Sequence, residues 1–196
     1  MKPLRVYLLA GAFLGFSSML VSCSTATPHE YHMDYPSYSS VGDMCANASL
    51  VVTGTPISFE VRNVNILSAD QGDSPEENPA LGTGEKPDNA YIVETVVTFQ
   101  VETVILGSSA KEGSRIEVGQ PGGEYQGVNY LAEQYSMEMD ETHLLFLQEF
   151  DDVPANLLNP SQAGFRLADD RTIARDSASS LVADATGLTA DSTLCS

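Results

Sequence analysis

Three histidines are the side chains of this chain most suited to metal or acid–base chemistry, and two of them lie close together. His29 and His32 are three residues apart, flanked by acidic residues and a methionine. Imidazole, thioether and carboxylate groups are ligands that transition metals use. The spacing is not that of a helical HExxH zinc site, and prolines on both sides disfavour a helix. Two interpretations stay open: a metal site at His29 and His32, or a polar segment that contains histidine by chance.

The third histidine, His143, precedes an apolar run that is typical of a buried strand. A Ser–His–Asp triad would have to use His143 as its base, and no Gly-x-Ser-x-Gly motif accompanies it. We therefore predict a hydrogen-bonded core histidine in preference to a general base. No catalytic residue and no cofactor is predicted, and we expect that the protein is not an enzyme.

The first 22 residues have the three parts of a removable signal peptide. Lys2 and Arg5 supply positive charge, an apolar run follows from Val6 to Leu20, and the small residue Ser22 precedes a cysteine. The run is too short for a comfortable membrane span, which needs about 20 apolar residues. The sequence therefore predicts export, with the mature chain outside the cytoplasm.

The four residues Leu20-Val21-Ser22-Cys23 resemble the lipobox of bacterial lipoproteins. The resemblance implies cleavage after Ser22 and a diacylglyceryl thioether on Cys23, followed by acylation such as palmitate. Two or three acyl chains hold a protein firmly at a bilayer, whereas one chain binds only marginally. We expect a protein anchored to the outer face of the cell membrane. The alternative is an ordinary signal peptide next to an incidental cysteine.

The chain is strongly acidic, with a formal net charge of −18. Such a charge repels phosphate backbones, so nucleic acid is not an expected partner. The acids either keep an exported domain soluble or bind cations and basic partners.

If Cys23 is acylated, one pair of cysteines is left, Cys45 and Cys195. In an oxidising compartment an isolated pair of this kind usually forms a bridge. We predict a structural disulfide that joins the C-terminal tail to the start of the folded region.

The composition divides the mature chain into a tether and one domain. Residues 23–44 are rich in Ser, Thr, Pro and Tyr without apolar periodicity, which indicates a flexible tether. Residues 45–196 form the expected single β-barrel domain. Within it, residues 68–90 are filled with Asp, Glu, Gly, Pro and Asn, which is typical of a long acidic loop.

Two segments have the period-two alternation of strands. In the first, from Leu50 to Val61, apolar and threonine residues share one face at every second position from Val51 to Val61, Phe59 among them. The second, from Tyr91 to Leu106, is unusually long. Its apolar face includes Phe99, and the opposite, polar face has these residues: Glu94, Thr98, Gln100 and Glu102. Strands so long must curl, as they do in small closed barrels.

Three shorter strands are expected at Arg115–Val118, Thr142–Phe150 and Gly164–Leu167. Five strands without a strong helical period predict a mainly β fold, a small Greek-key barrel of the OB type. The segment from about Asp176 to Leu188 is expected to form at most a short C-terminal helix.

Three segments in this order resemble the netrin-like module of tissue inhibitors of metalloproteases (TIMPs): Ala48–Thr55, Thr98–Gly107 and Thr142–Leu147. They are also similar to uncharacterised domains of exported proteins from Gram-positive bacteria such as actinobacteria. The resemblance covers residues 45–170 and implies an OB-like barrel with a cysteine before its first strand, a place that Cys45 fills. It does not imply protease inhibition, because Cys45 is not the N-terminal residue.

The sequence therefore favours a membrane-anchored module that binds another envelope protein or a small ligand. The loops Ser68–Asn89 and Gln120–Met139 are the expected contact regions. The alternative function is extracytoplasmic metal binding through His29 and His32.

Overall fold

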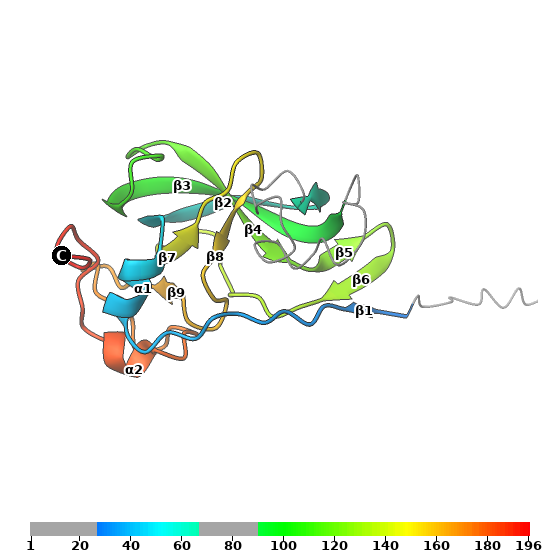
Figure 1. Cartoon of the computed structure of the whole chain (residues 1–196). Helices are drawn as coiled ribbons and strands as arrows, with labels where there is room; N and C mark the ends of the chain where they lie inside the picture. Colours follow the sequence, from blue (N-terminus) through cyan, green and yellow to red (C-terminus); the bar gives the residue numbers. More distant parts are fainter. Residues whose placement is uncertain (1–26, 67–89) are drawn as a thin grey trace, which may run out of the picture.

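Two long antiparallel strands form the frame of the molecule (Figure 1). The computed structural model describes residues 27–66 and 90–196. Strands β2 (Leu50–Asn65) and β3 (Tyr91–Leu106) pair along their whole length. Register shifts in β2 mark bulges, which bend a strand. Gly54 is needed at one of these bends, because a Cβ there would lie 2.0 Å from the backbone oxygen of Gln100.

Five strands close into a mixed β-barrel. Strand β3 pairs with β4 (Arg115–Pro121), β4 pairs in parallel with β8 (Ala155–Leu157), β8 pairs with β7 (His143–Gln148), and β7 returns to β2. The mainly β barrel predicted from the sequence is confirmed. The predicted strand at Gly164–Leu167 is present as β9 (Gly164–Arg166), but it is not the strand that closes the barrel. Strand β9 shares the outer edge of β7 with β8, and β8 completes the ring.

The remaining elements lie around this barrel. A small sheet is formed by β1 (His29–Glu30), β6 (Val128–Leu131) and β5 (Gly123–Tyr125). Helix α1 (Val41–Asn47) begins at Ser40, whose hydroxyl accepts a hydrogen bond from the Asp43 amide. Helix α2 (Val182–Ala185) is the short C-terminal helix expected from the sequence. No helix within the described residues has the length and hydropathy needed to cross a bilayer.

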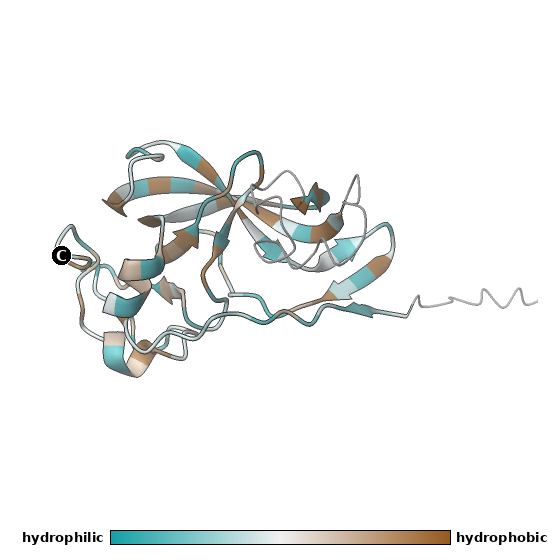
Figure 2. Ribbon diagram, viewed as in Figure 1, coloured by the Kyte–Doolittle hydropathy of each residue, from teal (hydrophilic) through white to brown (hydrophobic). Residues whose placement is uncertain are grey.

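Buried apolar residues of the strands form the core of the barrel. Figure 2 shows that hydrophobic positions recur along these strands. Phe99, Phe146 and Phe165 are fully buried, and Phe146 and Phe165 meet edge to face at 6.0 Å. The predicted alternation of β2 is wrong at its far end, since Phe59 is 43% exposed. The register shift between Pro56 and Ser58 explains this, because a one-residue slip reverses the faces of a strand.

The N-terminal segment packs along the barrel where we expected a flexible tether (Figure 1). This applies to residues 27–44, the part of the predicted tether that the structure describes. Tyr38 is buried, and its amide donates to the side-chain oxygen of Gln162 at 2.8 Å. The side-chain amide of Asn159 donates to the Pro36 carbonyl at 2.9 Å. The sequence suggested a tether because these contacts are made by tyrosines and backbone groups without an apolar period.

Candidate functional site

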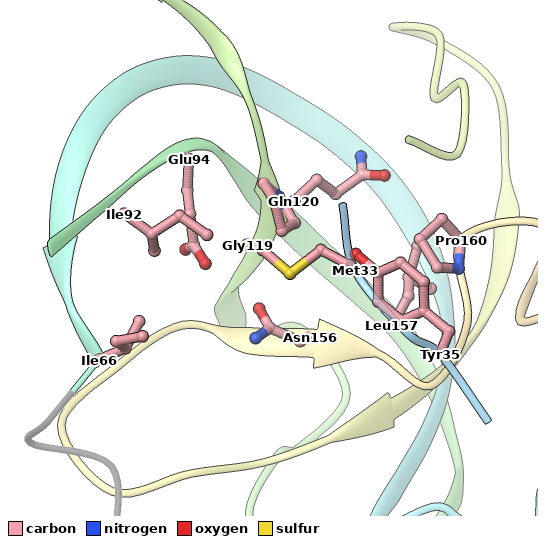
Figure 3. A pocket seen from close by; sticks show the side chains of 11 residues that line it. Met33, Tyr35, Ile66, Ile92, Glu94, Gly119, Gln120, Asn156, Leu157 and Pro160 are labelled. Carbon is pink, nitrogen blue, oxygen red and sulfur yellow. The ribbon is translucent and has the colours of Figure 1, made fainter. Parts of the chain in front are cut away.

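A cavity of about 180 Å³ lies between the barrel and the N-terminal segment (Figure 3). Its floor comes from β3, β4 and β8, and part of its wall comes from Met33 and Tyr35 of the N-terminal segment. Its apolar lining residues are these: Met33, Ile66, Ile92, Pro121, Leu157 and Pro160. The volume is slightly larger than that of an engineered protein cavity, about 150 Å³, that binds benzene.

Strand register brings two polar side chains to the floor of this cavity. Glu94 and Val96 share one face of β3, Val96 pairs with Gly119 of β4, and Gly119 pairs with Asn156 of β8. Paired residues in adjacent strands point to the same side of a sheet. Glu94 and Asn156 therefore flank Gly119 from either side, as Figure 3 shows.

Gly119 makes room for both side chains. A Cβ at this position would lie 2.4 Å from Glu94 Oε2 and 2.8 Å from Asn156 Oδ1. Any side chain at residue 119 would displace these two oxygens. Residue 119 therefore controls the polar floor of the cavity.

Glu94 is a buried carboxyl group without a hydrogen-bond partner for Oε2. The residue is only 2% exposed. Burial raises the pKa of Glu94 to about 7, and the nearby positive charge of Arg62 opposes this rise only in part. Arg62 is itself ion-paired with Glu117. The carboxyl group therefore changes its charge near neutral pH.

Two further oxygens at the cavity also lack a partner, Tyr35 Oη and Asn156 Oδ1. Burial raises the pKa of the Tyr35 phenol, and the negative charges of Glu133 and Glu94 act in the same direction. Buried polar atoms are hydrogen-bonded in the great majority of cases, so each exception needs an explanation. Three such oxygens at one apolar cavity indicate a place for a hydrogen-bonding ligand.

The N-terminal segment is held over the cavity by polar contacts. The amide of Val93 donates to the Tyr31 hydroxyl at 3.1 Å, and the Tyr31 amide donates to the Leu131 carbonyl at 2.8 Å. Tyr31 also packs on a small apolar cluster of Val64, Ile92 and Val96. This cluster covers the face of β3 that carries Glu94. The sequence placed Glu94 on a polar face because strand alternation alone does not reveal this cover.

His143 lies at a different polar site. It is 1% exposed, and the Tyr135 hydroxyl lies 2.9 Å from its Nδ1. Burial lowers the pKa of His143 and raises that of Tyr135, so a neutral phenol and a neutral imidazole share this hydrogen bond. Nε2 of His143 has no partner. His143 is therefore buried, as predicted, and one of its two ring nitrogens is hydrogen-bonded.

Among the residues that the structure describes, no further ligands lie beside the predicted metal-ligand pair, His29 and His32. The ring of His29 stacks on Tyr130 at 5.5 Å, and His32 is exposed. Across residues 27–66 and 90–196, no group of three or more His, Cys, Asp or Glu side chains is placed to hold a metal ion.

The predicted disulfide is present. Cys45 in α1 is bonded to Cys195, with their Cα atoms 5.4 Å apart. The bridge joins two positions 150 residues apart and fixes the C-terminal tail to α1. Cys23, the signal peptide and most of the acidic loop at 68–90 lie outside the described residues.

Comparison with known proteins finds no relative: no family model, curated protein or solved structure matches this chain.

The cavity was not among the predictions made from the sequence. Its one signal was Glu94, an acidic residue four positions into a strand of Val and Ile, and the residue type alone gave no reason to bury it.

Proposed function

We propose that this chain is a lipid-anchored extracytoplasmic binding module that holds a small ligand in the cavity above Glu94, Gly119 and Asn156. One observation carries the proposal. Three oxygens without hydrogen-bond partners, on Tyr35, Glu94 and Asn156, line one cavity with mainly apolar walls. Few polar groups in an apolar hollow are the usual composition of a small-molecule site.

The proposed anchor rests on the N-terminal sequence and on the place of β1. A lipobox-like segment ends at Cys23, and the packed chain begins at His29. Six residue steps reach at most about 20 Å. An acylated Cys23 would therefore hold the domain close to the outer face of the membrane, with the cavity available to extracytoplasmic ligands.

Binding is favoured over catalysis by the chemistry of the lining. Among the described lining residues, the ionisable side chains are Glu94 and Tyr35. A nucleophile next to a base would be expected in an acyl-transfer enzyme. A single carboxyl group between apolar walls is better suited to orienting a ligand.

We also propose that the barrel is related to the netrin-like module. The supporting features are the closed five-stranded ring and the cysteine that precedes its first long strand. Protease inhibition is not part of this proposal. Cys45 lies inside α1, so its nitrogen is part of a peptide bond and it has no free amino group to bind a protease metal.

The binding proposal is tested by a fragment screen on the full-length chain in detergent, with methyl NMR as the readout. We expect small ring compounds to shift the methyl signals of Ile66 and Ile92. Gly119→Ala should abolish these shifts, because the new Cβ displaces the two floor oxygens. Gly42→Ala in α1 is the control, since a Cβ there would make only an ordinary contact, 3.8 Å from Ser40 Oγ. The absence of any binding fragment would refute the proposal.

The anchor is tested by intact mass on protein extracted from membranes. We expect a chain that begins at Cys23 and carries two or three acyl groups. An unacylated chain would refute the lipoprotein assignment and leave the cavity proposal standing.

A further inference from the structure

The buried, unpartnered atoms at the cavity are all oxygens among the described lining residues. Glu94 Oε2, when ionised, and Asn156 Oδ1 can only accept hydrogen bonds, and the Tyr35 hydroxyl can accept as well as donate. A nearby side-chain donor, the Gln120 amide, is already used. It donates to the Tyr135 carbonyl at 3.1 Å and accepts from the Tyr135 amide at 2.7 Å. These three oxygens would therefore be satisfied by a ligand that donates hydrogen bonds.

The charged groups around the cavity indicate the charge of the ligand. Among the described residues, no cation forms an ion pair with Glu94: Arg62 is paired with Glu117 and only partly offsets the effect of burial on the carboxyl group. Glu133 also acts on this region; it is negative and raises the pKa of Tyr35. A buried carboxylate is stable only when it is paired. A cationic ligand would supply that missing partner, and the acidic protein surface would raise its local concentration.

The apolar walls of the cavity indicate that the part of the ligand that does not contact the three oxygens is small and apolar. Ile66, Ile92 and Leu157 face the cavity together with Met33 and Pro160 (Figure 3). The volume of about 180 Å³ accommodates one ring or a short alkyl chain. A bare metal ion would leave these walls without contacts. Ca²⁺ also takes six to eight oxygen ligands, more than the three oxygens gathered here.

We propose that the cavity binds a small organic cation, a protonated amine on a compact apolar body, with its ammonium group held by Glu94 Oε2, Asn156 Oδ1 and the Tyr35 hydroxyl. This inference rests on the proposed function and names the ligand class of the same cavity. The three N–H bonds of a primary ammonium match three acceptors. The apolar body lies against the isoleucine and leucine side chains.

The ligand class predicts a characteristic pH dependence. Binding requires an ionised Glu94, whose pKa is raised to about 7 in the free protein. Affinity for the amine should therefore fall as the pH drops through 7 and Glu94 takes up a proton. The affinity of a neutral compound of the same shape should stay nearly constant over this range.

The test compares matched ring compounds on the full-length chain in detergent, by calorimetric titration at about pH 8, where Glu94 is ionised and alkylamines are protonated. The probes are benzylamine, benzyl alcohol and benzoate. A charge-assisted hydrogen bond typically adds about 10- to 100-fold in affinity. We expect benzylamine to bind more tightly than benzyl alcohol by this factor, and benzoate to bind least.

Two variants separate charge from shape. Glu94→Gln keeps the size of the side chain and should remove the preference for benzylamine. Glu102→Gln lies on the same strand, next to Thr55 on an exposed face, and should leave the preference unchanged. Thermal unfolding of both variants checks that they fold.

The outcomes distinguish this inference from the proposed function. Equal binding of benzylamine and benzyl alcohol, or an unchanged preference in Glu94→Gln, would overturn the amine class and retain the cavity as a ligand site. Competition by Ca²⁺ at a concentration equal to that of benzylamine would also overturn it, in favour of a metal ion. If none of the probes or screened fragments binds, the proposed function itself fails.

Discussion

The two ends of strand β3 hold charged groups in opposite ways. Near its last residues, the Arg171 guanidinium donates to Thr53 and Thr103 hydroxyls, both at 3.0 Å, and to the Ala190 carbonyl at 3.2 Å. Nine residues earlier than Thr103, about 30 Å along the strand, the Glu94 carboxyl has an oxygen without a partner.

The contrast separates a structural end of β3 from the end at which we propose that a ligand binds, called the binding end below. The Arg171 end is covered by the C-terminal residues, which the disulfide fixes to α1. Its polar groups are satisfied within the protein, as stable interiors require. The Glu94 end is covered by a segment that reaches it through few hydrogen bonds and leaves a cavity. Unpaired groups of this kind are costly and are typical of functional sites.

The largest expected effect is a loss of stability when the disulfide at the structural end is removed. Replacing both bridged cysteines, Cys45→Ser with Cys195→Ser, should lower the free energy of unfolding by up to about 5 kcal/mol, because the bridge closes a loop of 150 residues. Denaturant titration measures this loss, and benzylamine binding to the folded variant should change little. A loss below about 1 kcal/mol would show that the C-terminal tail is held without the bridge.

The next effect concerns the charge at the binding end. The pKa of Glu94 rises from 4.5 to about 7 on folding, so the folded protein holds the proton more tightly than the unfolded chain. The stability from this residue is full below pH 4.5 and is lost as the pH rises through 7. A shift of this size corresponds to about 3 kcal/mol.

Glu94→Gln should abolish this loss. Compared with the unchanged protein, the variant should gain up to about 3 kcal/mol in stability between pH 4.5 and pH 8, measured by urea unfolding at a series of pH values. Parallel pH profiles of the two proteins would show that Glu94 titrates normally.

A smaller effect on stability is expected from the hydrogen bonds of the Arg171 guanidinium. Arg171→Met removes three hydrogen bonds and leaves the fully buried Thr53 hydroxyl without this donor, which should cost about 2 kcal/mol. Arg175→Met, at an exposed position four residues later, is the matched control and should be nearly neutral. Equal stabilities of the two variants, measured by thermal unfolding, would remove the distinction between the two ends of β3.

The smallest effect concerns the cover of the cavity. Tyr31→Phe removes the acceptor of the Val93 amide and should cost about 1 kcal/mol. Hydrogen exchange of the Val93 amide should become faster in this variant. Tyr130→Phe keeps the ring that stacks on Tyr31 and should leave the exchange rate unchanged.

The sequence predicted the barrel well because its signals are local. The alternation of β3, the apolar run of β7 and the lone pair of cysteines all lie within short segments or follow from counting. The last barrel strand, β8, was missed because its three residues are too few for a period to show and, unlike those of β9, include no aromatic or β-branched residue. The face of Phe59 was wrong because a bulge shifts the register within β2.

The candidate site could not be predicted in the same way. Glu94, Gly119 and Asn156 come from three strands and meet only through the pairing register. Tyr35 comes from a segment that we expected to be a tether. A buried carboxyl is rare, so a glutamate in an alternating strand predicts exposure by default. Long-range register and the cover provided by the N-terminal segment decide otherwise.

The most direct measurement is the pKa of the Glu94 carboxyl, followed by carbon NMR of the side chain in the free protein and with saturating benzylamine. We expect a pKa of about 7 in the free protein and a fall well below that value when the amine binds, because the ligand supplies the missing positive charge. A pKa in the usual range in the free protein, or one that benzylamine does not move, would contradict the claim that this end of the barrel is a site for an organic cation.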